Sequence, residues 1–467
     1  METLNNRCTG LCETCGKCKG ANLLDEMNDR KTKMIFMPDD FMPDQDQEQY
    51  GIAFDIGTTT VVGMLWDLKE NKMIGNMAMT NPQNEFGADV ISRIQYCSGD
   101  PNKFKMIRDK IIRCLNDLIG DLCNQNNIAQ NQVVRVTVGG NTTMSHIFGG
   151  YDPKTLAVAP FEPAYVGLKE FTANEVGLEI GEKARVILVP NIAGHVGGDI
   201  TAGIVATRLM KLDGLTLFID IGTNGEIVLS TKDKTVACST AAGPAFEGAS
   251  IYQGMRAAAG AIERIKIEDG KVLFKTIENC EPVGICGSGL IDAMGEMFKT
   301  GIIKKNGKLL MPEELKDEKL KDEMGQRLRK TGEQKEFVLV FKEQGKDIVI
   351  TQKDIREVQL AKGAIYAGIK LLLEELNLTV ADIDQVMIAG AFGNYINKES
   401  AVTIGLLPAV EYSRILSVGN AAGVGTSMIL LSNEEMEHAK SIVAKVAHIE
   451  LATCKNFQDE YLKAMSF

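Results

Sequence analysis

Residues 51–66 read Gly-Ile-Ala-Phe-Asp-Ile-Gly-Thr-Thr-Thr-Val-Val-Gly-Met-Leu-Trp, and most of what we infer about the chain starts from them. Large apolar residues alternate with Ala53 and Asp55 up to Gly57, which is the periodicity of a β-strand. A second apolar run begins at Val61, after a turn of small hydroxyl residues. The stretch therefore predicts a β-hairpin.

The turn of this hairpin carries residues suited to a nucleotide. A carboxylate at the end of an apolar strand, such as Asp55, is costly to bury unless it binds a cation or a hydrogen-bond donor. Gly57 allows backbone N–H groups to approach an anion, and the following hydroxyls add donors. These hydroxyls belong to Thr58, Thr59 and Thr60. An acid that can hold hydrated Mg²⁺ beside donors for phosphate predicts a nucleoside triphosphate site.

The same design recurs 165 residues later, where residues 215–230 place Asp220 at the position of Asp55. The second turn contains Gly222, Thr223, Asn224 and Gly225. This duplication predicts two homologous half-domains whose turns face each other across a nucleotide cleft. One alternative is two unrelated hairpins that share four residues. Another is an aspartic protease, but that class has the order Asp-Thr/Ser-Gly and an all-β chain, and this sequence has neither.

Composition is that of an ordinary globular protein. The chain has 467 residues, of which 45% are hydrophobic and 24% charged, so it can form two or three domains. No apolar run approaches the roughly 18 residues of a membrane helix, and the N-terminus does not resemble a signal peptide. We therefore expect a cytoplasmic protein without a membrane span. The net charge of −11 argues against nucleic acid as a partner.

Four of the eleven cysteines lie within residues 1–20, at Cys8, Cys12, Cys15 and Cys18. Four thiolates this close favour an iron–sulfur cluster, and we favour [4Fe–4S], with [2Fe–2S] as an alternative. Structural zinc also takes four cysteines, but usually as two pairs set far apart. The first three also fit the spacing of a radical-SAM loop, although nothing downstream predicts the barrel that such a loop opens.

Residues 21–49 are polar and acidic and are predicted to be a linker. As a flexible coil they would span roughly 30 Å and tether the cluster within reach of a partner. Strands alternate with helices after residue 50, which predicts an α/β fold. Residues 303–335 are rich in Lys, Glu and Asp and are expected to form a solvated surface insertion.

Further candidate residues lie in loops rich in glycine. Asp199 closes the loop 190–199, and either caps the helix expected from Thr201 or positions Mg²⁺ or the attacking water. Glu247, in the loop 241–249, is a candidate contact for a nucleotide ribose or a metal. The turn after the strand predicted at 385–389 is expected to lie against adenine. Its residues are Gly390, Ala391, Phe392 and Gly393. Residues 417–425 predict close packing of two helices at a hinge.

These motifs and their order resemble the phosphate-1, connect-1, phosphate-2 and adenosine motifs of the actin/sugar-kinase/Hsp70 (ASKHA) superfamily. The wording of several segments is similar to one branch, the reductive activators of corrinoid proteins. These segments are residues 81–94, 139–144, 190–199, 243–249, 388–394 and 418–425. Typical members begin with a plant-type [2Fe–2S] ferredoxin domain, whereas this chain has a short four-cysteine loop.

The resemblance implies duplicated ribonuclease H-like half-domains, at 50–212 and 213–467, around the nucleotide. It implies an ATPase that returns an electron to the Co(II) of a corrinoid protein in a methyltransferase system and so restores Co(I). Asp55 and Asp220 would hold hydrated Mg²⁺, and the two turns would bind phosphate. The other expected partner is a low-potential electron donor, and a homodimer is a candidate assembly.

Three other classes stay open from the sequence. An activator of a 2-hydroxyacyl-CoA dehydratase also combines this fold with a cluster, but one shared between subunits. A small-molecule kinase has no use for the N-terminal cysteines. A chaperone or scaffold would bind ATP without redox activity.

Overall fold

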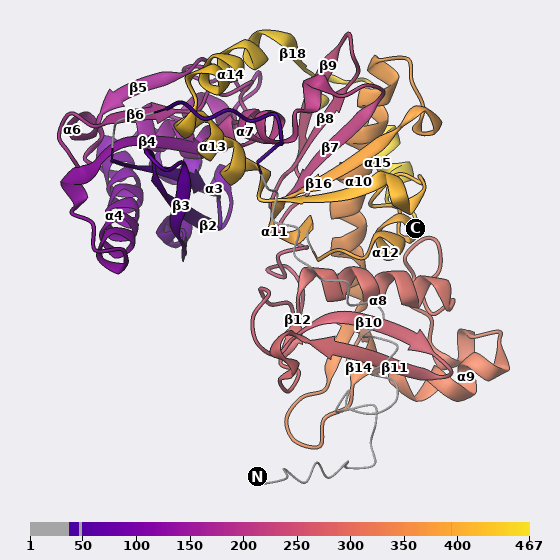
Figure 1. Cartoon of the computed structure of the whole chain (residues 1–467). Coiled ribbons are helices and arrows are strands. Elements are labelled where there is room, and N and C mark those ends of the chain that lie inside the picture. Colours follow the sequence, from indigo (N-terminus) through magenta and orange to yellow (C-terminus); the bar gives the residue numbers. More distant parts are fainter. Residues whose placement is uncertain (1–36, 46–48, 394) are drawn as a thin grey trace.

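A computed structural model describes residues 37–45, 49–393 and 395–467, and two six-stranded sheets organise them (Figure 1). The first sheet has the order β3-β2-β1-β4-β6-β5, and the second has the order β17-β16-β7-β8-β9-β18. The strands of the first sheet are β1 (Tyr50–Ile56), β2 (Thr60–Asp67), β3 (Lys72–Thr80), β4 (Val133–Gly140), β5 (Lys169–Thr172) and β6 (Arg185–Leu188). Those of the second are β7 (Thr216–Ile221), β8 (Gly225–Ser230), β9 (Thr235–Thr240), β16 (Gln385–Ala389), β17 (Ile415–Gly419) and β18 (Val446–His448).

Five strands of each sheet share one order and pairing, which confirms the predicted duplication, whereas the sixth strands, β5 and β18, lie at opposite edges. In the first, β1 pairs antiparallel with β2 and parallel with β4. In the second, β7 pairs antiparallel with β8 and parallel with β16. Asp55 and Asp220 lie at equivalent places, each one residue before the end of its central strand. The predicted α/β class with two related halves is therefore correct.

Helices flank these sheets; α10 lies against the second one, and α15 packs on α10 (Figure 1). Their bounds are α3 (Val90–Cys97), α4 (Pro101–Gln125), α5 (Thr142–Gly149), α6 (Ala173–Val176), α7 (Gly198–Thr207), α8 (Gly287–Lys299), α9 (Glu318–Met324), α10 (Gln352–Glu375), α11 (Gly390–Gly393), α12 (Lys398–Thr403), α13 (Ala421–Leu431), α14 (Asn433–Lys445) and α15 (Phe457–Ala464). Helix α4 begins where the Asp100 carboxylate accepts hydrogen bonds from two backbone N–H groups, with Pro101 in the first turn. No helix of the described residues is long and apolar enough to cross a membrane.

Helix α13 returns from the second half to the first. It packs against α7, β1 and β4, and the indole N–H of Trp66 on β2 donates to the Ser427 hydroxyl at 3.2 Å. The two helices approach closely because a Cβ on Gly425 would lie only 1.9 Å from the carbonyl oxygen of Ala202. The close packing of two helices predicted around 417–425 is therefore present, and the hinge stays a prediction. Helices α13 and α14, which the sequence prediction grouped with the second half, pack with α7 in a core cluster that contains residues of both halves, such as Val189 and Phe218.

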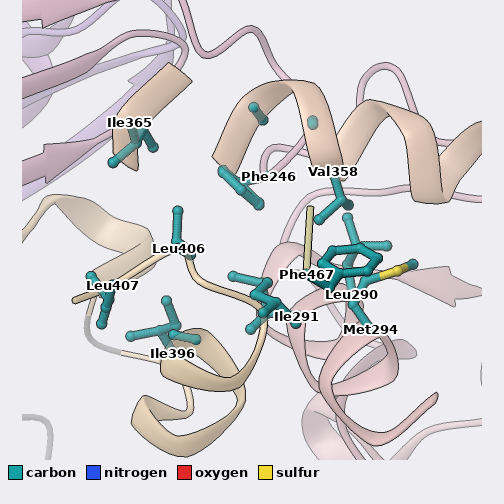
Figure 2. Packing of buried hydrophobic residues seen from close by; sticks show 14 of the residues in the cluster. Phe246, Leu290, Ile291, Met294, Val358, Ile365, Ile396, Leu406, Leu407 and Phe467 are labelled. Atoms are coloured by element: carbon teal, nitrogen blue, oxygen red, sulfur yellow. The ribbon is translucent and has the colours of Figure 1, made fainter. Parts of the chain in front are cut away.

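Strands β10 to β15, with α8 and α9, form a smaller subdomain below the second sheet (Figure 1). The strands are β10 (Ala261–Glu268), β11 (Lys271–Thr276), β12 (Gly284–Ile285), β13 (Leu328–Thr331), β14 (Gln334–Val340) and β15 (Ile348–Thr351). Its core is continuous with that of the second half, and Figure 2 shows Leu290, Ile291 and Met294 of α8 near Phe467. Residues 303–335 are not simply a solvated insertion, because Leu309 and Met324 are buried in this core.

Residues 37–45, part of the predicted linker, are docked on the first half. Met37 and Phe41 pack against its hydrophobic clusters. The Asp40 carboxylate accepts from Arg208 at 2.9 Å, and the Asp44 carboxylate accepts from the Asn433 side chain at 2.7 Å. A flexible coil is therefore the wrong description of these nine residues, because Met37 and Phe41 pack against the core even though Met42 is exposed. Most of the predicted linker (21–36), like the cysteine segment, lies outside the described residues.

Candidate functional site

Three carboxylates predicted from separate motifs converge between the two halves. Asp55 lies next to the end of β1, Asp220 lies next to the end of β7, and Asp199 lies in the first turn of α7. The cap of α7 is Gly197, so the capping role considered for Asp199 is wrong. The Asp199 carboxylate instead accepts from the next backbone N–H, that of Ile200, at 2.8 Å.

Burial raises the pKa of all three carboxyl groups, and repulsion by neighbouring carboxylates adds to the shift of Asp220 and Asp199. Burial raises the pKa of Asp55 to about 6, although a hydrogen bond from Asn420 opposes the shift. Burial, with the nearby charge of Asp55, raises the pKa of Asp220 to about 7. Burial, then the charges of Asp220 and Asp55, raise the pKa of Asp199 to about 8. Three acids that repel one another favour a cation or a bound proton at this place.

A fourth acid, Glu226 on β8, was not among the residues predicted from the sequence. It lies opposite Asp220 in the β7–β8 register, is buried, and accepts from the Ser239 hydroxyl at 3.2 Å. Burial and the charges of Asp199 and Asp220 raise its pKa well above the usual range. The signal was present, because a charged residue within the apolar run 225–229 needs a partner.

The two turns have the compact shape that phosphate binding needs. The Gly57 N–H donates to the Thr60 carbonyl at 2.9 Å, and the Gly222 N–H donates to the Asn224 carbonyl at 2.9 Å. A Cβ on Gly57 would lie 2.7 Å from the Thr60 oxygen, so a side chain does not fit there. Gly225 also permits close packing, since a Cβ there would meet Ile365 of α10.

Arg93, which the sequence prediction passed over, fixes the first turn. It is fully buried, and its guanidinium donates to the carbonyl oxygens of Thr58 at 2.6 Å and Gly87 at 2.9 Å. A third acceptor is the side chain of Asn84. Burial lowers the Arg93 pKa to about 10, which leaves the group charged at neutral pH. The first turn is thus backed by a positive charge.

Glu247 joins the two turns. Its carboxylate accepts from the Thr59 hydroxyl at 2.8 Å and from the Thr223 hydroxyl at 2.5 Å. Thr59 belongs to the first half and Thr223 to the second. The loop 241–249 therefore reaches both phosphate-type turns at once.

The third predicted motif lies against the acids. Residues 390–393 form the short helix α11, and Gly390 has φ of 85°, which favours glycine. A Cβ on Gly390 would lie 2.8 Å from a carboxylate oxygen of Asp220. The motif and the second turn are thus neighbours, as an adenosine motif beside a phosphate motif requires.

The chemistry of the site suits a hydrated divalent cation. In the described part of the chain, no group of three or more His, Cys, Asp or Glu residues could hold a metal ion directly. Mg²⁺ commonly keeps several waters and uses one or two carboxylates together with substrate phosphates. The acids at Asp55 and Asp220 fit that kind of binding. The four predicted cluster ligands, Cys8 to Cys18, lie outside the described residues.

Known proteins resemble this chain over most of its length. Residues 50–212 match a family model described as the RACo middle region, and residues 214–467 match one described as the C-terminal domain of RACo, the ASKHA domain. The chain is 40% identical to the corrinoid activation enzyme RamQ of Eubacterium limosum over 433 residues. This match covers 92% of this chain and 72% of that protein. It is 26% identical over 462 residues to a reductase of a Co(II) methylated amine-specific corrinoid protein from Methanosarcina barkeri, covering 90% of this chain and 77% of that protein. A solved structure of a reductive activator for a corrinoid, iron–sulfur protein matches with a TM-score of 0.80 at 41% identity, over 91% of this chain and 67% of the other.

Proposed function

Because the chain belongs to the RACo family of reductive activators, we propose that it reduces the Co(II) of a corrinoid protein to Co(I) in an ATP-dependent reaction. The observation that carries this proposal is the convergence of two equivalent acidic turns, at Asp55 and Asp220, in a chain with such relatives. The corrinoid protein is the partner, and an external low-potential donor supplies the electron.

ATP is the nucleotide expected of the family's ASKHA domain. Asp55 and Asp220 hold hydrated Mg²⁺ in this proposal, and Asp199 orients the attacking water. The phosphates bind to the two turns, through the backbone amides near Gly57 and Gly222 and through the turn hydroxyls. The base lies on the 390–393 motif.

The reaction needs energy because Co(I) is a strong reductant. Each 1.4 kcal/mol of coupling free energy shifts a one-electron equilibrium by about 59 mV, so nucleotide binding and hydrolysis can make an uphill transfer favourable. The close pair of α7 and α13 links the two halves, so closure on the nucleotide changes the surface offered to the corrinoid protein.

The electron carrier in this proposal is an iron–sulfur cluster held by Cys8, Cys12, Cys15 and Cys18. It passes one electron to Co(II) and is reduced again by the external donor. The cysteine spacing supports a [4Fe–4S] cluster.

The test uses the full chain, purified without oxygen, with iron counting and visible spectroscopy. Addition to a Co(II) corrinoid protein with a low-potential donor should give Co(I) only when MgATP is present. The double variant Cys12→Ala/Cys15→Ala should lose cluster absorbance and Co(I) formation but keep ATP binding. The matched control Cys280→Ala changes an exposed cysteine and should retain both. Co(I) formation by the double variant would refute the cluster assignment, and a colourless wild-type protein indifferent to MgATP would refute the whole proposal.

A further inference from the structure

We propose that Glu247 is a latch which holds the two turns together and which the γ-phosphate of ATP displaces. We use the word latch for the arrangement of Thr59, Glu247 and Thr223. The inference rests on the proposed function, because it assumes that ATP binds between these turns. It assigns Glu247 a role that differs from a contact with ribose or metal.

The two threonine hydroxyls cannot serve Glu247 and a phosphate at the same time. A threonine hydroxyl has one hydrogen to donate, and in this structure Thr59 and Thr223 both donate it to Glu247. A phosphate oxygen and a carboxylate oxygen are both acceptors, so neither can satisfy the other. If the hydroxyls are to donate to a phosphate, the Glu247 carboxylate has to leave them.

Charge also makes Glu247 and phosphate compete. A carboxylate and a triphosphate are both anions, and the buried guanidinium of Arg93 is a nearby cation whose charge interacts with Glu247. Arg93 is held by the Thr58 carbonyl, so it stays with the first turn whichever anion is present. It therefore favours one anion at a time, either Glu247 or phosphate.

The segment that follows Glu247 is tightly packed and also contacts the first half. Gly248, next in the chain, has φ of 81°, and a Cβ there would lie 2.6 Å from the backbone nitrogen of Met255. The same loop places the Arg256 guanidinium 3.2 Å from the Thr80 hydroxyl of the first half. The loop 247–256 thus makes two hydrogen-bonded links to the first half, and displacement of Glu247 acts on a tightly packed segment that leads into the lower subdomain.

The latch distinguishes nucleotides by their terminal phosphate. ATP carries the group that competes with Glu247, whereas ADP lacks it and leaves the latch closed. A latch closed about nine parts in ten lowers the apparent affinity for ATP about tenfold. Opening is thereby tied to the presence of the γ-phosphate.

The test measures binding of ATP and ADP, each with Mg²⁺, to the full chain by calorimetry. Glu247→Ala should bind ATP about tenfold more tightly and change its ADP affinity by less than about threefold. Glu247→Gln keeps the shape but loses the charge, and should lie between wild type and Glu247→Ala. The matched control is Glu333→Ala, in the exposed turn between β13 and β14, which should bind both nucleotides as wild type does.

Hydrogen exchange supplies a readout that is independent of affinity. In the wild-type protein, amides of residues 245–249 should exchange faster with a non-hydrolysable ATP analogue than with ADP. In Glu247→Ala they should exchange fast with either nucleotide. Weaker ATP binding by Glu247→Ala would overturn the latch and support a metal or ribose contact, and an affinity change of less than threefold would also overturn it. A wild-type protein that binds no MgATP would instead refute the proposed function.

Discussion

Replacing Gly425 with alanine should force apart the two helices that join the halves. The added Cβ would lie 1.9 Å from the carbonyl oxygen of Ala202 in α7, whereas real Cβ atoms essentially never come closer than 3.0 Å. The helices must therefore separate by about 1 Å, and the atom that is met is backbone, which cannot rotate away. Overpacking of a close-packed core costs about 1–3 kcal/mol. We expect the upper end of that range, about 3 kcal/mol.

The measurement is the guanidinium midpoint of unfolding, read by the fluorescence of Trp66, the chain's single tryptophan, which contacts α13. The matched control is Gly167→Ala, because a Cβ there meets nothing within 4 Å. That control should stay within about 0.5 kcal/mol of wild type. If Gly425→Ala unfolds at the same denaturant concentration as Gly167→Ala, then close contact between α7 and α13 is not what joins the halves.

Three further predictions concern the acids. Asp220→Asn should abolish ATP turnover while cluster absorbance stays unchanged, and normal hydrolysis would contradict its proposed role. Burial and two neighbouring charges raise the pKa of Asp199 to about 8, so its ionisation destabilises the fold as pH rises from about 4 to about 8. In thermal melts, Asp199→Asn should therefore be as stable as wild type at pH 4 and increasingly more stable than wild type as pH rises to about 8. Burial would raise the pKa of Glu435, but hydrogen bonds with His438 and Arg208 outweigh it and lower the pKa to about 2. The ionised Glu435 therefore stabilises the fold above pH 4.5, and this stabilisation is lost as pH falls towards 2. Glu435→Gln should lower the free energy of unfolding by at most about 3 kcal/mol at pH 7 and leave it unchanged at pH 2, which denaturant titrations at both pH values can check.

The hairpins could be predicted because their evidence is local. Alternating apolar residues around Asp55 and Asp220 give the strand period, and a repeated pattern suggested homologous halves before any packing was known. The structure confirms both hairpins at the expected positions. The roles of the individual turn residues stay predictions.

What the sequence could not supply depends on contacts between distant segments. Nothing near Arg93 indicates that its guanidinium reaches the Thr58 carbonyl across 35 residues of chain. The sequence left the capping role of Asp199 open, because glycine and aspartate are both accepted near a helix start and the choice depends on local dihedral angles. The many charged residues of 303–335 suggested a solvated insertion, but a few apolar side chains there, such as Leu309, pack into the core.

The return of α13 to the first half affects how the protein can fold during synthesis. Leu430 and Leu431 of that helix cover Met64 and Trp66, yet they leave the ribosome long after the first sheet is complete. About 240 residues, from the end of β6 to Leu430, separate the two events, or roughly 12–48 s of translation at ordinary rates. Throughout that interval the nascent first half carries an uncovered apolar patch that other nascent chains or a chaperone can meet. A fragment ending at residue 212 would keep that patch permanently exposed, so aggregation is its expected fate.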